Sequence, residues 1–166
     1  RLPEYFGAAW PTVSRFAAML REQGELRGLL GPREQSRLWE RHLLNSAAVV
    51  QHLPRTGVIT DVGSGAGLPG IVVAAMLPEA ELVLIDPMER RTQWLEEVVA
   101  ELGLSNVRVV RARAEELDGA LEADAVTARA VAAMDKLARW CLPLLRDGGT
   151  LVALKGRSAG DELENA

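Results

Sequence analysis

The chain of 166 residues has a single cysteine and no long hydrophobic run, and each scarcity excludes a class of protein. Because Cys141 stands alone, an internal disulfide, a thiolate zinc site and a Cys-x-x-Cys redox pair are all impossible. This cysteine usage favours a reducing, cytoplasmic location. The longest apolar run, Ile71 to Leu77, is far shorter than the roughly 20 apolar residues of a membrane-spanning helix. The sequence therefore predicts no membrane partner.

Lysine is also scarce, since only Lys136 and Lys155 accompany the arginines among the 19 cationic residues. The net charge of −4 excludes the broad positive field of an indiscriminate nucleic-acid binder, although a local basic patch can still bind phosphates. Arginine favours phosphate and base-edge contacts, but a base-composition bias of the genome would give the same excess. The length and the apolar fraction of 48% predict one globular domain with a short extension.

Residues 1–53 carry helical periodicity. Val13, Phe16, Ala17 and Leu20 recur at helical spacing between Pro11 and Gly24, so they predict a helix with one buried face. A second helix is expected from Pro32 to the residue before Pro54. Its predicted buried stripe consists of Trp39, Leu43, Ala47 and Val50. Its opposite face is basic and consists of Arg33, Arg37 and Arg41, followed by Asn45.

From residue 57 onward, short β-type runs alternate with helical stretches. The predicted strands are 58–62, 81–85, 107–110, 123–127 and 150–154, and the predicted helices are 69–77, 90–102 and 134–145. This alternation predicts an α/β fold with a mainly parallel sheet that helices cover on both faces.

A glycine-rich loop, Asp61 to Gly70, follows the first of these strands and opens a helix. Glycines there let the backbone turn sharply and approach a ligand, and the free amides at a helix start favour anionic or polar groups. The second strand ends at Asp86, where a carboxylate can accept both hydroxyl hydrogens of a ribose. This combination predicts a nucleotide-like ligand at the carboxyl edge of the sheet.

Two cofactors compete for this site. Gly65, Gly67 and Gly70 match the G-x-G-x-x-G pattern of dinucleotide folds, so an NAD(P)-dependent oxidoreductase is one alternative. The loop, however, begins with an acid at the strand tip, and this acid-led form resembles the first motif of Rossmann-like S-adenosylmethionine-dependent methyltransferases. Asp86 then resembles their ribose acid, and Ala114 and Glu115 lie where that class contacts adenine.

Four segments make the resemblance more specific, namely Arg41 to Ser46, Asp61 to Gly70, Thr127 to Ala130 and Leu154 to Gly156. Together they resemble the small-subunit (16S) ribosomal RNA guanine-N7 methyltransferases, also called the glucose-inhibited division protein B family. The resemblance implies a Rossmann-like three-layer sandwich (57–166) that binds S-adenosylmethionine, preceded by a helical extension (1–56). Because this fold usually ends in a hairpin and the chain stops at Ala166, we expect that hairpin to be missing.

The resemblance also implies roles for individual residues. Arg129 is the candidate catalytic residue. The implied cofactor-binding residues are Asp61, Gly63, Ser64, Gly65, Gly67, Leu68, Asp86, Ala114, Glu115 and Arg129. The implied contacts to 16S ribosomal RNA are Arg37, Arg41, His42, Arg90, Arg91 and Lys155. The expected protein is a monomer without a metal.

Two departures from the family concern the region of these RNA contacts. The family usually has an acid at the position of Asn45, and it has an Asn-Leu-Thr segment that Leu26 to Gly31 does not reproduce. Besides the oxidoreductase, two alternatives stay open, because a fold alone fixes no acceptor. One is a methyltransferase that acts on another acceptor, and the other is a non-catalytic, S-adenosylmethionine-binding RNA module.

Overall fold

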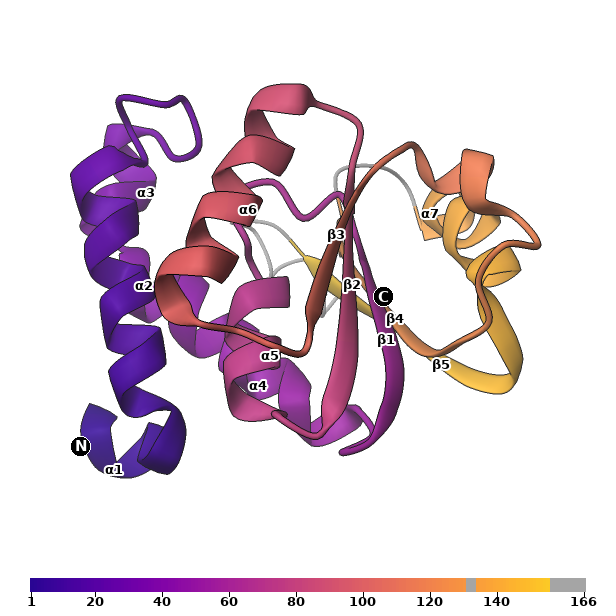
Figure 1. The fold of residues 1–166 in the computed structure, drawn as a ribbon, viewed down its shortest axis with the longest axis horizontal. Helices are drawn as coiled ribbons and strands as arrows, with labels where there is room; N and C mark the ends of the chain where they lie inside the picture. The colour runs from indigo at the N-terminus through magenta and orange to yellow at the C-terminus, as the bar shows by residue number, and fades with distance from the viewer. Residues whose placement is uncertain (131–133, 156–166) are drawn as a thin grey trace.

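In the computed structural model, which describes residues 1–130 and 134–155, five strands form one sheet with helices on both faces (Figure 1). The four pairs of neighbouring strands are all parallel. The spatial order is β3-β2-β1-β4-β5. Every predicted strand is confirmed, since each predicted run lies inside one of β1 (Gly57–Val62), β2 (Ala80–Asp86), β3 (Val107–Arg111), β4 (Ala123–Ala130) and β5 (Leu145–Lys155).

The helices between the strands also follow the prediction, with one correction. They are α5 (Gly70–Met76), α6 (Glu89–Leu102), the short η4 (Ala114–Leu117) and α7 (Met134–Cys141). The helix that was predicted over 134–145 ends early, because the chain tightens into the 3₁₀ turn η5 (Leu142–Leu144). Pro143 in this turn has no N–H to continue an α-helical ladder.

The N-terminal extension contains more breaks than its periodicity predicts. The first expected helix is confirmed as α2 (Trp10–Gln23), which α1 (Leu2–Phe6) and the 3₁₀ turn η1 (Gly7–Ala9) precede. The single helix expected from residue 32 is wrong, because the backbone of Arg37 leaves the helical region with φ −119° and ψ 24°. That stretch instead forms α3 (Pro32–Ser36), the π-helical η2 (Leu38–Leu43), α4 (Leu44–Val49) and η3 (Val50–His52).

The break changes which residues of this stretch are buried. Leu43 and Ala47 of the predicted stripe are buried, but Trp39 and Val50 are only half-buried. Leu38 and His42 are buried instead. The predicted basic face is exposed at Arg33, Arg37 and Asn45, whereas Arg41 is half-buried.

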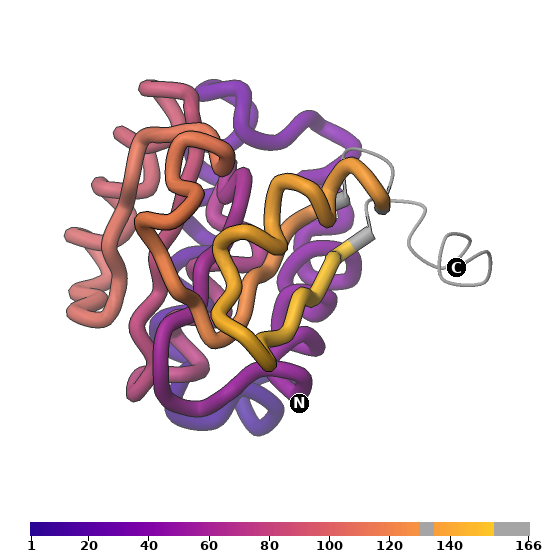
Figure 2. The backbone as a smooth tube through the Cα atoms, turned by 90° about the vertical axis from the view of Figure 1, so that its right-hand side faces the viewer, coloured from indigo at the N-terminus to yellow at the C-terminus, as the bar shows by residue number. Residues whose placement is uncertain are grey.

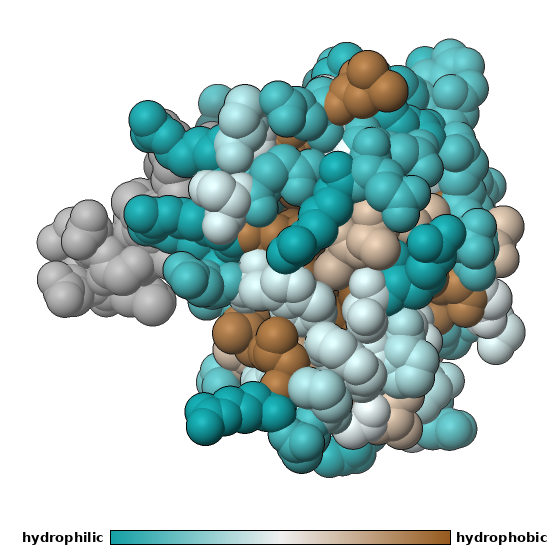
Figure 3. Space-filling view, turned by 90° about the vertical axis from the view of Figure 1, so that its left-hand side faces the viewer, coloured by the Kyte–Doolittle hydropathy of each residue, from teal (hydrophilic) through white to brown (hydrophobic). Residues whose placement is uncertain are grey.

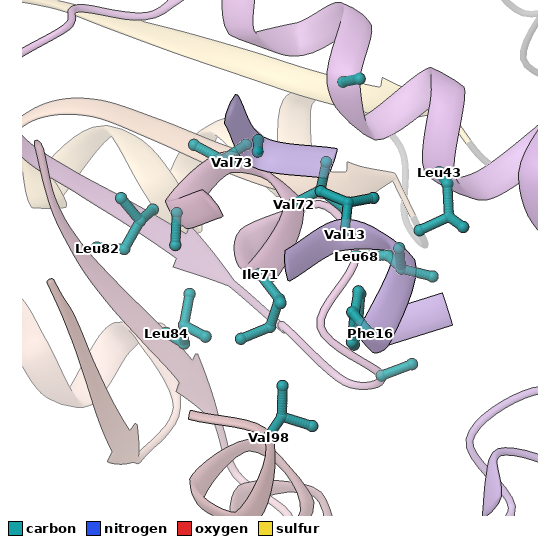
Figure 4. Packing of buried hydrophobic residues seen from close by; sticks show 14 of the residues in the cluster. Val13, Phe16, Leu43, Leu68, Ile71, Val72, Val73, Leu82, Leu84 and Val98 are labelled. Atoms are coloured by element: carbon teal, nitrogen blue, oxygen red, sulfur yellow. The ribbon is translucent and has the colours of Figure 1, made fainter. Parts of the chain in front are cut away.

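Alternating residues of the strands face two hydrophobic clusters. Leu82 and Leu84 belong to the cluster that α2, α5 and α6 cover, and Val83 and Ile85 belong to the cluster under α7. Figure 4 shows the larger cluster, in which Phe16 of α2 lies close to Leu68 of the glycine loop. Figure 2 shows the opposite side, where α7 and β5 are in front. The extension therefore shares one core with the sheet and lies over α5 and α6.

The outer face of the extension is mainly hydrophilic, with separate hydrophobic side chains between the polar ones (Figure 3). None of the described helices is both long and apolar enough to span a membrane.

The strand order places a crevice beside the glycine loop. From β1 the chain leads to β2 on one side, while β4 and β5 lie on the other side of β1. In open α/β sheets, ligands bind outside the carboxyl ends of the strands at such a reversal of direction. The fold therefore points to the carboxyl ends of β1 and β4 as the functional site.

Candidate functional site

The glycine loop is held by backbone hydrogen bonds to the neighbouring strand. Gly63, Gly65 and Gly67 have φ values of 70°, 53° and 101°, a region that L side chains rarely adopt. The N–H groups of Gly63 and Ser64 both donate to the carbonyl of Ile85. These bonds fix the loop across the ends of β1 and β2, so its backbone forms one wall of the crevice.

Asp86 ties the end of β2 to this loop. Its carboxylate is 1% exposed and accepts hydrogen bonds at 2.9 Å from the N–H groups of Gly65 and Met88, one at each oxygen. The Arg91 guanidinium lies 3.9 Å from Oδ2. Since a carboxylate has about four acceptor sites, Asp86 retains acceptor capacity for the hydroxyl groups of a ribose.

Asp61 lies behind the loop, fully buried. Its Oδ2 accepts the N–H of Gly70 at 3.1 Å and its Oδ1 accepts the hydroxyl of Thr127 at 2.8 Å. Burial raises the pKa of Asp61 to about 6, although these hydrogen bonds and the charge of Arg129 oppose the shift. A Cβ on Gly70 would lie 2.5 Å from Oδ2, so the glycine at this position is what lets α5 start against the carboxylate.

A cavity of about 350 Å³ lies in front of the loop, at the carboxyl ends of the strands. A larger cavity, of about 540 Å³, lies at the opposite edge of the sheet near Gly57 and Asp124. We assign the site to the smaller one, because the carboxyl edge is where parallel α/β sheets bind ligands. Its lining residues are Leu29, Val62, Gly63, Ser64, Gly65, Ala66, Asp86, Pro87, Met88, Arg91, Arg129, Leu137 and Trp140.

Arg129 brings a positive charge to this cavity from the end of β4. Burial lowers the pKa of Arg129, while Asp61 and Glu34 raise it. Its guanidinium makes no hydrogen bond within residues 1–130 and 134–155. Several N–H donors are therefore available to a ligand in the cavity.

His42 lies in η2 of the extension and is 7% exposed. Burial and, to a smaller extent, the charges of Arg129 and Arg41 together lower the pKa of His42 to about 4, while the charge of Glu34 opposes the shift. His42 is therefore neutral at pH 7, so it offers a hydrogen-bonding imidazole rather than a cation for phosphate.

The structure brings together some of the sequence-predicted site residues and separates others. Gly63, Ser64, Gly65, Asp86 and Arg129 line the cavity. The described lining does not include Asp61, Gly67, Leu68, Ala114 or Glu115. Asp61, Gly67 and Leu68 lie behind the cavity wall, where they hold the glycine loop in place. Ala114 is buried in the cluster under α7, and Glu115 is exposed on η4.

The predicted RNA contacts are spread more widely. Arg37 and Arg90 are exposed, and Arg41 is half-buried. Arg91 lies on the wall of the cavity beside Asp86. Lys155 pairs through its backbone with Ala130 at the end of β5, while its side chain lies outside what the structure describes.

Sequence reasoning missed several lining residues. Met88 follows Asp86 by two residues, so its position just after β2 could have identified it as a residue of the cavity wall. Leu29 and Trp140 come from a loop of the extension and from α7, and no motif marks either residue. The described residues contain no group of three or more His, Cys, Asp or Glu side chains placed to hold a metal ion.

Solved structures show the same fold. One is the precorrin-6y C5,15-methyltransferase of Geobacter metallireducens, with a TM-score of 0.58 at 17% identity over 82% of this chain and 71% of that one. A parallel sheet with an acid-led glycine loop, a buried acid after β2 and a cavity between them fits S-adenosylmethionine. Together with a family match over residues 10–166, the fold and site define a Rossmann-like, S-adenosylmethionine-dependent methyltransferase.

The family follows from the sequence comparisons. Residues 10–166 match the GidB family, described as rRNA small subunit methyltransferase G, and the chain belongs to this family. Two relatives are named ribosomal RNA small subunit methyltransferase G. That of Thermobifida fusca is 53% identical over 98% of this chain and 69% of its own length. That of Leifsonia xyli subsp. xyli is 56% identical over 98% of this chain and 78% of its own.

The family membership decides against one alternative from the sequence. The dinucleotide pattern of Gly65, Gly67 and Gly70 does not mark an oxidoreductase, since the chain is a methyltransferase. In the structure, Gly70 is the first residue of α5 and donates its N–H to Asp61. The small size of Gly70 allows α5 to pack close to β1.

Proposed function

We propose that this chain transfers a methyl group from S-adenosylmethionine to N7 of a guanine in 16S ribosomal RNA of the small ribosomal subunit. We further propose that it acts in the cytoplasm as a monomer. The observation that carries the assignment is Arg129, a cation on the cavity wall whose donors are not used within the described residues. Membership of the small-subunit rRNA methyltransferase family supports the acceptor.

Backbone and acidic groups of the chain would hold the cofactor. Gly63, Ser64 and Gly65 offer backbone on the cavity wall, and Asp86 offers acceptor sites for ribose hydroxyls. Asp61, Gly67 and Leu68 would act behind them by fixing the loop. We place Ala114 and Glu115 at the adenine end, because η4 follows β3, the strand beside β2.

The proposed reaction needs little acid–base chemistry from the protein. When bound, S-adenosylmethionine supplies an electrophilic methyl group on a sulfonium. Guanine N7 has a lone pair and no proton to lose, so the chain needs to position the base in line rather than to deprotonate it. A single hydrogen bond from Arg129 to guanine O6 would orient the base and leave the N7 lone pair free.

The remaining cations would contact the RNA backbone. Arg37 and Arg90 are exposed, as phosphate contacts require, and we assign them to this rim together with Arg41, Arg91 and Lys155. His42, which is neutral at pH 7, would offer the RNA a hydrogen bond rather than a charge. Because phosphate contacts release counterions, the affinity for RNA is expected to fall steeply with salt. An affinity that hardly changes between low and high salt would contradict the rim.

The test is to incubate the protein with methyl-labelled S-adenosylmethionine and unmodified small ribosomal subunits, and then to analyse the RNA nucleosides. Label in 7-methylguanosine is the expected result, and Arg129→Gln serves as the control with an impaired site. Label on another atom or in ribosomal protein would overturn the acceptor assignment. Cofactor binding without transfer to either subunits or free RNA would favour a non-catalytic binding module instead.

A further inference from the structure

The segment Gly24–Gly31 connects α2 to α3 and contributes to the cofactor cavity. The N–H groups of Leu29 and Leu30 both donate to the carbonyl of Gly24, which closes the segment into a tight turn. Leu30 is buried in the core, and Leu29 lines the cavity. The helical extension therefore supplies part of the cavity wall, and its position relative to the glycine loop affects the shape of the cavity.

Arg27 fixes this segment to α6. Its Nη1 and Nη2 donate to the two carboxylate oxygens of Glu97 at 2.8 and 2.9 Å, and Nη1 also donates to the side chain of Gln23 at 3.0 Å. A fork of this kind restrains direction as well as distance. The Cζ atom of Arg27 lies 5.1 Å from the centre of the Trp94 ring, so the guanidinium also contacts the aromatic face.

Trp94 continues this contact into the glycine loop. The side chain is fully buried, and its Nε1 donates a hydrogen bond of 2.9 Å to the carbonyl of Ala66. Ala66 lies between Gly65 and Gly67 in the loop and lines the cavity. One indole ring thus contacts the Arg27 guanidinium through its face and the cofactor loop through its N–H.

A second ion pair between the extension and α6 provides an internal comparison. Arg15 of α2 lies 3.7 Å from Glu101 near the end of α6. Both side chains are about half exposed, and Arg15 has no aromatic contact among the described residues. This pair also joins the extension to α6, but neither of its residues makes a hydrogen bond or ion pair with the glycine loop among the described residues.

We propose that Arg27 and Trp94 are positioning residues for the cofactor, because they fix the Gly24–Gly31 segment and the Ala66 carbonyl, which both contribute to the cavity wall, relative to each other. The proposal rests on the proposed function, since it concerns the same cofactor site. Arg27 acts through the Trp94 ring, and Trp94 acts through the Ala66 carbonyl. Neither residue needs to touch the cofactor.

The test measures the dissociation constant of S-adenosylmethionine by calorimetry, without RNA, for Trp94→Phe, Arg27→Ala, the double variant and Arg15→Ala. Trp94→Phe keeps an aromatic ring but removes the indole N–H, which leaves the buried Ala66 carbonyl without its donor, so we expect about tenfold weaker binding. Arg27→Ala should weaken binding about threefold. Because Arg27 acts through Trp94, the double variant should bind about as weakly as Trp94→Phe alone.

Three further readouts separate positioning from general destabilisation. Arg15→Ala should bind the cofactor as the unchanged chain does, and Arg27→Lys should recover part of the affinity that Arg27→Ala loses. In methyl transfer, the KM for the cofactor should rise in both single variants, while kcat at saturating cofactor should stay within about twofold. A thermal melt of each variant should show whether it remains folded.

Each outcome bears on one proposal. Unchanged affinity in Arg27→Ala and in folded Trp94→Phe, with tight binding by the unchanged chain, would overturn the positioning role alone. Equal weakening by Arg15→Ala and Arg27→Ala would also overturn it, since docking of the extension would then be sufficient. Should Trp94→Phe fail to fold, the comparison of Arg27→Ala with Arg15→Ala still decides the question. Failure of the unchanged chain to bind S-adenosylmethionine would instead overturn the proposed function.

Discussion

The Thr127 hydroxyl donates a hydrogen bond of 2.8 Å to Oδ1 of Asp61, its direct partner on the neighbouring strand. This bond joins β1 and β4, where the order of the strands reverses. The other oxygen of Asp61 holds the first N–H of α5. One buried carboxylate therefore connects two strands and a helix directly behind the cofactor loop, and its protonation state should affect all three.

Replacement of Asp61 by Asn should change the pH dependence of stability. The native pKa of Asp61 is raised from 3.8 to about 6, so the native state binds a proton between these pH values that the unfolded state does not bind. Asp61 therefore makes the free energy of unfolding decrease as pH rises from about 4 to 6, by up to about 3 kcal/mol. Urea denaturation at several pH values would measure this contribution as the difference between the unfolding free energies of the unchanged chain and of Asp61→Asn. A difference that does not change between pH 4 and 6 would contradict the raised pKa.

Replacement of His42 by Gln should have the opposite effect on the pH dependence of stability. Its native pKa is lowered from 6.5 to about 4, so the unfolded state binds the extra proton in this window. His42 therefore makes the free energy of unfolding decrease as pH falls from about 6.5 to 4. The unchanged chain should show a shallow curve between pH 4 and 6, because the two residues oppose each other.

The two variants serve as controls for each other. His42→Gln should reveal the Asp61 slope and become more stable toward acid relative to the unchanged chain, while Asp61→Asn should lose stability toward acid. If both variants changed the curve in the same direction, the assigned pKa shifts would be wrong for one of the two residues.

Gly63→Ala should impair cofactor binding by more than its cost in stability. An added Cβ on Gly63 would meet no protein atom within 4 Å, and Gly63 lines the cavity, so we expect the added methyl group to crowd a bound cofactor rather than the protein. Gly103 at the end of α6 is the matched control, because its φ of 64° is close to the 70° of Gly63 and its surroundings are equally open. Both substitutions should cost about 1 kcal/mol in thermal or urea denaturation. Only Gly63→Ala should weaken S-adenosylmethionine binding, and equal affinities would place the cofactor elsewhere.

The sequence predicts the sheet and the motif loop well, because their signals are local. The strands are short apolar runs that two helical layers bury, and the acid-led loop marks its own position after β1. The extension was harder to predict. Its periodicity continues through Arg37, but tertiary packing breaks the helix there and rotates His42 inward.

The cavity wall was predictable only in part. Asp86 and the glycines come from recognisable motifs. Leu29 belongs to the wall because Arg27 and Glu97, 70 residues apart, hold the turn against α6. No local pattern contains that contact, so a single sequence does not reveal it.

Arg129→Gln should lower methyl transfer far more than it lowers stability. The guanidinium makes no hydrogen bond in the part of the chain that the structure describes, so the thermal midpoint should change little. The loss of a donor that orients the base should lower kcat by about a hundredfold. Arg139→Gln on the exposed face of α7 is the matched control and should remain active. Because the charge of Arg129 opposes the raised pKa of Asp61, Arg129→Gln should also move the Asp61 slope to higher pH. Full activity in this variant would remove Arg129 from the site, whatever its effect on Asp61.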